Sequence, residues 1–448
     1  MKIQLIHPPH PDALEDRLDV PLGLLYLASS IQHAGHEVVL SDLTGGTRDE
    51  DWRREIIDDA DIYGITTYFA TQDIATRIAQ IAKDKNPNGK VIGGGASLTC
   101  FVEQGITEFV PKEYDSVVVG DGELSILELM DDFPNLNPTY QTPIGKDLDK
   151  LPRPNYGLVD LGTYKRTING RKSLTMLTSR GCPFRCTFCG LPRQHRKINY
   201  RSPEDVADEM EDIQEKYGIS AFNIQDDTFL VNKKRIKRWA ELVRDQDIIF
   251  KCHGKTGLDT EEDYAMLAEV GLVQLAWGIE TGSPTLLEKM NKGHGVTVES
   301  GIDVIRWAQK YGIDDRVFLI VGFPGETRET IEETKRYIER ANPTQVIINT
   351  FQPYPDTDVW KHPEKYGVTK IYDDFSAYEQ VKGENKGGRV NIDTLWTSRE
   401  EMEELDAEFR EWMNNRDPKL ARQEYETDQT TKSEEIKGSR IIKAKNLP

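Results

Sequence analysis

The stretch from Ser179 to Gly190 reads SRGCPFRCTFCG and holds three of the five cysteines of the chain. Cys182, Cys186 and Cys189 follow one another with the spacing C-x3-C-x2-C. Three thiolates with this spacing can hold three corners of a cubane iron–sulfur cluster, whereas a cluster held by protein alone takes four. One iron is then left open. Because an open position on a bound metal is where a substrate or cosubstrate binds, the stretch predicts a catalytic 4Fe–4S site.

Two other interpretations of the cysteines are weaker. A zinc site could recruit Cys252, His195 or His253 as a fourth ligand, but zinc ligands usually come as two separated pairs. A disulfide is disfavoured because the cysteine count is odd and because Pro8 and Pro9 interrupt the N-terminus before a signal-peptide core can form. We therefore expect a reducing, cytoplasmic location.

Composition limits the classes of partner. The 448-residue chain is 37% hydrophobic and 30% charged, which is typical of a globular protein with two or more domains. Its net charge of -19 repels phosphate backbones, so we expect no nucleic-acid partner. No apolar run approaches the ~20 residues that a membrane-spanning helix needs. We expect no membrane span.

Residues 1–138 alternate short β-branched runs with helical patterns. This predicts an α/β domain with a Rossmann-like or flavodoxin-like doubly wound parallel sheet, which binds ligands beyond the carboxyl ends of its strands. The expected strands are 2–7, 37–40, 61–68, 90–94 and 116–120, and the expected helices are 21–33, 52–58, 72–85 and 124–131.

Small residues and prolines follow these strands. Without side chains, the glycines would let a large ligand approach the backbone, or they simply make turns. The candidate ligand-binding residues are Pro8, Pro9, Thr66, Thr67, Gly93, Gly94, Gly95, Gly120 and Glu123.

A proline-rich linker is expected over 139–170, followed by strands and helices that alternate again over 171–360. The six expected strands are 174–178, 221–225, 248–251, 273–278, 317–321 and 346–350. They predict a partial (β/α)6 TIM-like barrel with its site at the carboxyl ends of the strands. A helix opened by Ser202 and Pro203 should run to Lys216.

Polar and small residues again follow the strands. Asp226 and Asp227 could neutralise an ammonium, or cap a turn before the helix at Lys233. Cys252 is expected to be a buried small hydrophobe. The other candidates are Gln225 after the second strand, Glu280 and Ser283 after the fourth, and Gly322, Phe323, Pro324, Gly325 and Glu326 after the fifth.

The final stretch is expected to form a small helical region over 361–423 and a disordered tail over 424–448. Within it, 397–414 predicts an acidic amphipathic helix packed on the barrel mouth. Its expected apolar stripe is Met402, Leu405, Phe409 and Trp412.

The cysteine spacing, with the aromatic Phe188 before the last cysteine, resembles the signature of radical S-adenosylmethionine (SAM) enzymes. The N-terminal region resembles the cobalamin-binding domain that precedes many of them, through Pro8-Pro9, the stretch 21–28, the stretch 35–38 and Gly93-Gly94. The resemblance implies a 4Fe–4S cluster, SAM and cobalamin. It implies SAM contacts at Phe188 and at the candidates after the second, fourth and fifth barrel strands, and cobalamin contacts at those of the first domain.

The chain departs from the resemblance in two places. It lacks the D-x-H-x-x-G loop of methionine-synthase-like proteins, so we expect base-off cobalamin without a histidine ligand. His7 and His10 are expected to be turn or surface residues. Asp356 replaces the glycine of the family's P-x-P-G-T turn, which alters the expected substrate contacts there.

The activity that the resemblance implies is reductive cleavage of SAM to a 5′-deoxyadenosyl radical, followed by methylation of an unactivated carbon through methylcobalamin. An external one-electron donor such as flavodoxin or ferredoxin is implied. The alternatives are a radical SAM cyclase, isomerase or coupling enzyme whose first domain binds cobalamin or no cofactor, and a non-catalytic cobalamin or redox sensor. A protein side chain, a lipid precursor and a natural-product intermediate would all fit as substrate.

Overall fold

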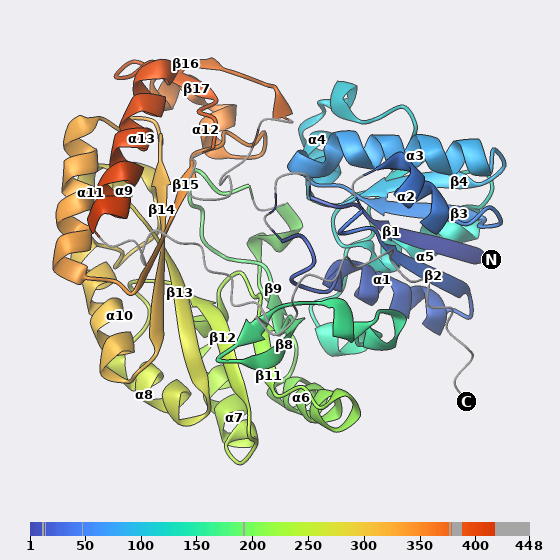
Figure 1. Ribbon diagram of the computed structural model, residues 1–448, viewed down its shortest axis with the longest axis horizontal. Coiled ribbons are helices and arrows are strands. Elements are labelled where there is room, and N and C mark those ends of the chain that lie inside the picture. The colour runs from blue at the N-terminus through green and yellow to red at the C-terminus, as the bar shows by residue number, and fades with distance from the viewer. Residues whose placement is uncertain are drawn as a thin grey trace. The chain divides into compact units, whose positions relative to one another are not determined.

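The computed structural model describes residues 1–10, 13, 15–46, 48–190, 193–375, 378 and 388–416. The described residues form two compact units, one of Met1–Arg166 and one that begins at Thr167 (Figure 1). The tail predicted to be disordered, 424–448, lies outside the described residues. No helix in the described part of the chain has the length and the apolar composition that crossing a membrane requires.

The first unit is built on a six-stranded sheet in which every neighbouring pair is parallel. The strand order is β2-β1-β3-β4-β5-β6. The order changes direction at β1, and the crevice at such a switch point is where open α/β sheets bind ligands. The predicted doubly wound sheet is confirmed. The strands are β1 (Lys2–His7), β2 (Glu37–Asp42), β3 (Ile62–Thr66), β4 (Lys90–Gly94), β5 (Ser116–Val118) and β6 (Thr139–Tyr140).

Helices α1 and α5 pack against each other, as do α2 and α3, and Figure 1 shows α3 and α4 on the opposite side of the sheet from α1 and α5. The apolar faces of α2 and α3 cover a core that includes Ile6, Tyr63 and Val91. The helices are α1 (Leu22–His33), α2 (Asp49–Glu55), α3 (Gln72–Lys85), α4 (Ala96–Gln104) and α5 (Gly122–Asp132).

The second unit is built on an open seven-stranded sheet of order β15-β14-β13-β12-β11-β8-β7. Six strands run parallel, and β7 pairs antiparallel with β8 at one edge. The sheet does not close, so the predicted partial barrel of six units is confirmed. The strands are β7 (Thr167–Ile168), β8 (Arg171–Met176), β11 (Ala221–Ile224), β12 (Ile249–Gly254), β13 (Leu272–Glu280), β14 (Asp314–Val321) and β15 (Gln345–Thr350).

The helices between these strands begin at recognisable caps. Ser202 accepts from the backbone N–H of Asp205, as expected, and Thr297 and Thr327 form capping boxes. Each helix buries one apolar stripe against the sheet, and Figure 1 shows them along its outer side. They are α6 (Pro203–Tyr217), α7 (Lys233–Val243), α8 (Glu261–Glu269), α9 (Pro284–Met290), α10 (Val298–Lys310) and α11 (Arg328–Ala341).

The C-terminal part of the second unit contains α12 (Asp358–Lys361), β16 (Val368–Ile371), β17 (Ile392–Thr394) and α13 (Arg399–Arg416). Met402, Leu405 and Phe409 are buried on α13, as predicted, but the next buried apolar residue is Met413. The assignment of Trp412 to the stripe was wrong. Trp412 is partly exposed and stacks on Phe409, because the buried position one turn after Phe409 is 413.

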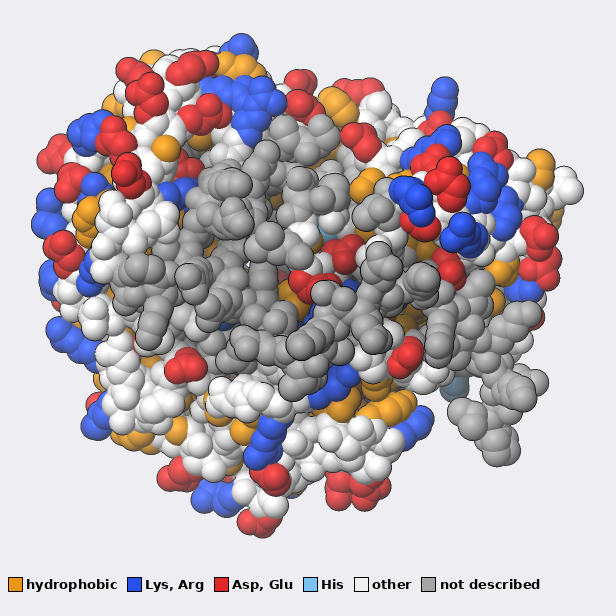
Figure 2. Space-filling model, in the orientation of Figure 1, with side chains coloured by type: hydrophobic (Ala, Val, Ile, Leu, Met, Phe, Trp, Pro, Cys, Tyr) orange, Lys and Arg blue, Asp and Glu red, His pale blue; other side chains and the backbone are white. Residues whose placement is uncertain are grey.

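The surface mixes charges of both signs. On the face drawn in Figure 2, acidic and basic side chains alternate over the coloured surface and do not gather by sign.

Candidate cofactor site

The cysteine loop is closed at its base by a two-stranded hairpin. Strand β9 (Ser179–Arg180) pairs antiparallel with β10 (Asn199–Tyr200), so both ends of the loop are held together. Gly181 leaves β9 with φ of 101°, and a Cβ there would lie 2.3 Å from the carbonyl oxygen of Lys197. Only glycine fits this position, because both the conformation and the contact exclude a side chain.

Hydrogen bonds fix the loop from within. The backbone N–H of Cys182 donates to the carbonyl of His195 at 2.8 Å, and that of Cys189 donates to the carbonyl of Cys186 at 3.2 Å. The guanidinium of Arg196 donates to the carbonyls of Phe184 and Cys189 at 3.2 and 3.1 Å. One side chain therefore ties together both sides of the cysteine segment.

The two aspartates after β11 hold the chain that leads into the loop. The carboxylate of Asp226, 1% exposed, accepts from the N–H and hydroxyl of Thr178 at 2.6 and 2.5 Å and from the hydroxyl of Ser179 at 2.7 Å. Asp227 accepts from the N–H of Gly181 at 2.9 Å. Both oxygens of Asp226 are engaged by the chain itself, so Asp226 acts as a positioning residue.

This arrangement bears on both interpretations of the acidic pair. The alternative in which the aspartates cap a turn before α7 is wrong, because the turn Phe229–Val231 has Thr228 at its N-cap and α7 itself is capped by Asn232, which accepts from the N–H of Arg235. The ammonium contact predicted for Asp226 and Asp227 stays a prediction; Gln225 and Asp227 are exposed, whereas Asp226 is buried.

The far side of the loop rests on the end of α9. The N–H and hydroxyl of Thr187 donate to the carbonyls of Met290 and Lys289, both at 3.0 Å. These carbonyls lie in the last turn of a helix and have no intrahelical partner of their own. The loop is therefore anchored by β8–β11 on one side and by α9 on the other.

Each phenylalanine of the loop lies beside a lysine. The Nζ of Lys255 is 4.2 Å from the centre of the Phe184 ring, and the Nζ of Lys292 is 5.7 Å from that of Phe188. Lys292 is 6% exposed and its charge is paired with Glu280 at 2.5 Å. Lys255 donates to the carbonyl oxygen of Lys292, a neutral group.

Burial lowers the pKa of Lys255, and the positive charge of Lys292 lowers it further. The thiols of Cys186 and Cys182 act in the opposite direction, which places Lys255 within electrostatic reach of two cluster ligands. Lys255 thus brings a positive charge, without a carboxylate partner among the described residues, next to the predicted cluster.

Glu280 occupies an unusual backbone conformation. Its φ is 70°, in the left-handed region, and the register between β13 and β14 shifts at Gly278 and Glu280. A bulge of this kind redirects a side chain, and a non-glycine residue in this region stores about 1–3 kcal/mol of strain. Ser283, fully buried, precedes α9 as its N-cap.

The turn after β14 is buried and reaches the cysteine loop. Phe323 lies edge-on to Phe188, with ring centres 6.4 Å apart. The carboxyl group of Glu326 accepts from the N–H of Gly322, and burial raises the pKa of Glu326 to about 8. At neutral pH this carboxyl group holds its proton. Pro324 and Gly325 are buried in the same turn.

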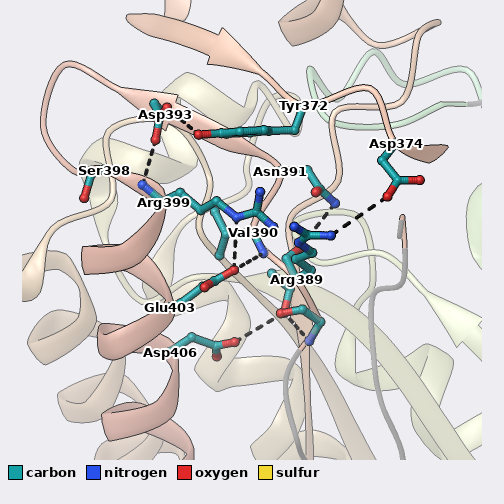
Figure 3. Close-up of polar contacts among 12 residues, drawn as sticks. Tyr372, Asp374, Arg389, Val390, Asn391, Asp393, Ser398, Arg399, Glu403 and Asp406 are labelled. Atoms are coloured by element: carbon teal, nitrogen blue, oxygen red, sulfur yellow. Dashed lines mark hydrogen bonds and ion pairs between the residues drawn. The ribbon is translucent and has the colours of Figure 1, made fainter. Parts of the chain in front are cut away.

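The C-terminal segment covers this turn. The atoms that a Cβ on Gly322 would meet include Met402 Cγ at 3.5 Å and Val390 Cγ2 at 4.0 Å. Figure 3 shows what holds the segment: Glu403 accepts from the N–H of Val390 and from Arg399, both at 3.3 Å. Asp393 in turn accepts from the N–H of Arg399 at 2.8 Å.

In the first unit, a side chain at Gly93 or Gly95 would come too close to neighbouring atoms. A Cβ on Gly93 would lie 2.6 Å from Leu98, and one on Gly95 would lie 2.6 Å from the carbonyl of Thr67. Gly95 also has φ of 103°. A Cβ on Gly94 would meet nothing closer than 3.6 Å, so Gly94 leaves the more open approach to the backbone.

The other candidates of the first unit lie beside these glycines or at neighbouring strand ends. The N–H of Thr67 donates to Gly94 at 2.7 Å, and its hydroxyl bonds the Tyr114 hydroxyl at 3.1 Å. Gly120 donates to Thr99 at 2.8 Å. Pro8, Pro9 and Glu123 are buried, and Thr66 is partly exposed at the end of β3.

His7 is not the turn or surface residue that the sequence suggested. It is the last residue of β1, and its Nδ1 is buried without a hydrogen-bond partner among the described residues. Burial lowers its pKa, which favours the neutral imidazole. His10 is exposed, as expected.

Comparison with known proteins shows which family the chain belongs to. The model of the radical SAM superfamily matches residues 176–338, and that of the B12-binding domain matches residues 20–130. An uncharacterized methyltransferase of Pyrococcus horikoshii is 31% identical over 386 residues, which cover 81% of this chain and 83% of the relative. The chain belongs to the cobalamin-dependent radical SAM methyltransferase family.

Other relatives widen the range of named activities. An anaerobic magnesium-protoporphyrin IX monomethyl ester cyclase of Rubrivivax gelatinosus is 27% identical and covers 81% of this chain and 69% of its own. The solved structure of the radical SAM methyltransferase TsrM of Kitasatospora setae, with cobalamin and a 4Fe–4S cluster, superposes with a TM-score of 0.68. It is 19% identical and covers 82% of this chain and 80% of its own, so it supports the fold.

The family uses a 4Fe–4S cluster, SAM and cobalamin, and the residues present fit the cluster. Cys182, Cys186 and Cys189 are partly exposed on an anchored loop, while Cys252 and Cys100 are buried. Among the described residues, no three histidine, cysteine or acidic side chains converge as they would around a single metal ion. Cysteines on a cubane bind separate irons and stand farther apart than the ligands of one ion.

Radical SAM enzymes also require an electron donor.

The sequence did not reveal three residues that the structure brings to the site: Arg196, Lys255 and Lys292. Lys255 follows a strand, Lys292 follows a helix and Arg196 ends a short 3-10 helix, and no local pattern marks any of them. Only the spacing of Lys292 after α9 could have suggested a role, because the C-terminal end of a helix favours a cation.

Proposed function

We propose that this protein is a cobalamin-dependent radical SAM C-methyltransferase that methylates an unactivated carbon. The observation that carries the proposal is the three-cysteine loop, held against the turn after β14, in a chain that also has a B12-binding domain. The first relative reported above is itself named a methyltransferase.

Cys182, Cys186 and Cys189 are proposed to hold the 4Fe–4S cluster, with one iron left for SAM. When bound, the cluster supplies the electron that cleaves SAM to a 5′-deoxyadenosyl radical, and cobalamin supplies the methyl group. The loop's hydrogen bonds hold the backbone of the cysteine segment in place. Such preorganisation leaves less reorganisation to occur during the reaction.

The proposed SAM contacts line the carboxyl ends of the barrel strands. Glu280, neutralised by Lys292, offers carboxylate oxygens to the ribose hydroxyls, and Asp227 and Gln225 face the amino group. The buried turn from Gly322 to Glu326 offers backbone groups to the adenine, while the neutral Glu326 carboxyl holds the turn closed. Phe188 and Ser283 complete the set. Because these groups exclude water, they protect a reactive radical from side reactions.

Cobalamin is proposed to bind at the switch point of the first sheet. The tail would pass Gly94 with Thr66, Thr67, Gly93 and Gly95, while Pro8, Pro9, Gly120 and Glu123 line the neighbouring strand ends. We propose the base-off form without a histidine ligand, since the chain lacks a D-x-H-x-x-G loop. Domain boundaries are proposed at 1–138, 139–170, 171–360 and 361–423.

We also propose a cellular location, an electron donor and a class of substrate. A cytoplasmic location suits an oxygen-sensitive cluster and an acidic chain with an odd number of cysteines. The electron donor would be a carrier such as flavodoxin or ferredoxin. The substrate would be a small molecule or a peptide.

The test is anaerobic reconstitution followed by incubation with SAM and a reductant. The expected products are 5′-deoxyadenosine from one SAM and S-adenosylhomocysteine from a second, in equal amounts once substrate is supplied. Cys186→Ala should abolish both, whereas Cys100→Ala, at a buried cysteine in the first unit, should retain them. Absence of 5′-deoxyadenosine from the reconstituted wild type would refute the proposal.

A second candidate is a radical cyclase, favoured by the relative named as a cyclase. This enzyme would form 5′-deoxyadenosine without S-adenosylhomocysteine. The ratio of the two products therefore separates the candidates.

A further inference from the structure

A cleft opens on the second unit beside the cysteine loop. Its volume is about 810 Å³, and Cys186 is among the residues that line it. The cleft runs between the end of α9, helix α12 and the turn between β17 and α13. It is therefore a place where the surface of the unit comes close to a predicted cluster ligand.

The cleft has the opposite charge balance to the rest of the chain. Five basic and three acidic side chains line it, although the whole chain carries a net charge of -19. Arg185 and Lys361 are exposed. Lys361 donates to a backbone carbonyl, that of Asp356, at 2.7 Å. Lys289 lies over the ring of Trp396 at 4.3 Å. These three cations have only uncharged partners or none among the described residues.

An exposed apolar pair stands at the rim. Leu395 is 73% exposed and Trp396 is 45% exposed, and the described chain has only two other exposed large hydrophobics, Met1 and Tyr68. An aromatic and an aliphatic side chain beside basic residues are typical of a protein-docking surface.

We propose that this cleft is the docking site of a small acidic one-electron carrier protein, which reduces the cluster through Cys186. The proposal rests on the proposed function, since only a redox cluster in the loop needs an electron from outside. The reduced carrier loses one electron and the cluster gains it. No bond forms or breaks. Electron transfer weakens steeply with distance, and a carrier seated here meets the cluster at one of its ligands.

The partner's chemistry follows from the charges. An acidic carrier is repelled by a chain of net charge -19, so its encounter needs a local basic surface to orient it. The Arg185, Lys289 and Lys361 side chains supply that surface, and Leu395 with Trp396 supplies the apolar contact. A weak contact of this kind suits a carrier that must leave after each electron.

The test measures the rate of cluster reduction by stopped-flow absorbance, with reduced plant-type ferredoxin as the carrier. Lys361→Glu is compared with Lys237→Glu, which makes the same charge change at an exposed lysine of α7 far along the chain. At low ionic strength, Lys361→Glu should slow reduction by about three- to tenfold, and the difference should shrink as salt is added. The Lys237→Glu protein should be reduced at the wild-type rate.

Two further measurements show whether a slower reduction comes from weaker docking or from a damaged cluster. Reduced methyl viologen, a small cation, should reduce the Lys361→Glu protein at least as fast as the wild type, because it does not need a basic surface. Leu395→Ser should raise the ferredoxin concentration at half-maximal rate and leave the salt dependence unchanged. Equal ferredoxin rates for the two charge variants would overturn the docking site.

A rate that falls equally with ferredoxin and methyl viologen would also overturn it, because the cluster itself would then be damaged. Failure of docking and failure of the proposed function remain distinguishable. Wild-type protein reduced by methyl viologen should still form 5′-deoxyadenosine even where the ferredoxin arm fails.

Discussion

At the scale of single residues, the charges around the cysteine loop are arranged unequally. Lys292 is neutralised by Glu280, whereas Lys255 donates to a carbonyl, forms no ion pair with a described residue and lies over the ring of Phe184. A positive charge near a cluster favours the form that carries one more electron. Lys255 would therefore raise the midpoint potential of a cluster held by the three cysteines.

Replacing Lys255 tests this effect without any turnover. Lys255→Met should lower the midpoint potential by about 50–100 mV, the size expected for unit charges several ångströms apart at an effective dielectric constant of ~20. Lys255→Arg, which keeps the charge, should leave it nearly unchanged. The measurement is a redox titration followed by electron paramagnetic resonance. An identical potential in the Met and Arg variants would contradict the role.

Glu326 gives the second prediction at this scale. Burial raises its pKa in the folded protein to about 8, above its value in the unfolded chain. The folded state thus holds a proton that the unfolded state releases, so the free energy of unfolding falls as pH rises from about 4.5 to about 8. The slope approaches ~1.4 kcal/mol per pH unit and vanishes above pH 8. Asp406, paired with Arg410 on α13, is the acidic neighbour that adds to the shift.

Glu326→Gln should remove this part of the pH dependence. The measurement is the thermal midpoint between pH 5 and 9, compared with Glu329→Gln, an exposed position on α11. The control should follow the wild-type curve. A wild-type slope in the Glu326→Gln protein would show that Glu326 is ionised in the folded state.

At the scale of elements, the cysteine loop depends on anchors from several strands and helices. The three hydrogen bonds to Asp226 hold the residues that lead into it. Hydrogen bonds to a buried carboxylate contribute about 1.5–3 kcal/mol each and do not add fully. Loss of the hydrogen bonds to Asp226 should therefore loosen the cysteine loop.

Asp226→Asn should cost ~2–4 kcal/mol, because an amide keeps the shape but presents a donor to groups that are donors themselves. It should also lower the iron bound per chain on reconstitution. Asp245→Asn, at an exposed site after α7, is the matched control. Iron content equal to the control would mean that the loop does not need this anchor.

Sequence patterns predicted most elements but not their partners. β1, β4 and α3 have the predicted bounds, because each carries a clear period and ends at glycine, proline or asparagine. Helix α4 was missed because its residues 97–101 are all buried and show no contrast between faces. The anchoring role of Asp226 and the placement of Lys255 could not be predicted, since both depend on contacts between distant segments.

At the scale of the whole molecule, the chain has two compact units, each with its own parallel sheet. A lesion confined to one unit should leave the cofactor of the other in place. Gly95 is a suitable site, because it combines φ of 103° with a close approach to Thr67.

Gly95→Ala should lower the cobalamin bound per chain and leave the iron per chain unchanged. Gly105→Ala is the control, since Gly105 also has positive φ, 73°, but a Cβ there meets nothing within 4 Å. Both contents are measured on the same reconstituted sample, by absorbance and iron assay. A parallel loss of iron in the Gly95→Ala protein would show that the units do not load independently.

The anchoring of the cysteine loop has a consequence for how the protein matures. Thr187 is fixed by the carbonyls of Lys289 and Met290, and its own carbonyl accepts from the N–H of Val359 at 3.3 Å. These partners leave the ribosome about 100 and 170 residues after the cysteines. A nascent chain that displays all three thiols therefore lacks the walls that would shield a cluster. If the three cysteines hold a cluster, a shielded site for iron and sulfide would therefore exist only once translation has passed α12, late in the synthesis of the chain.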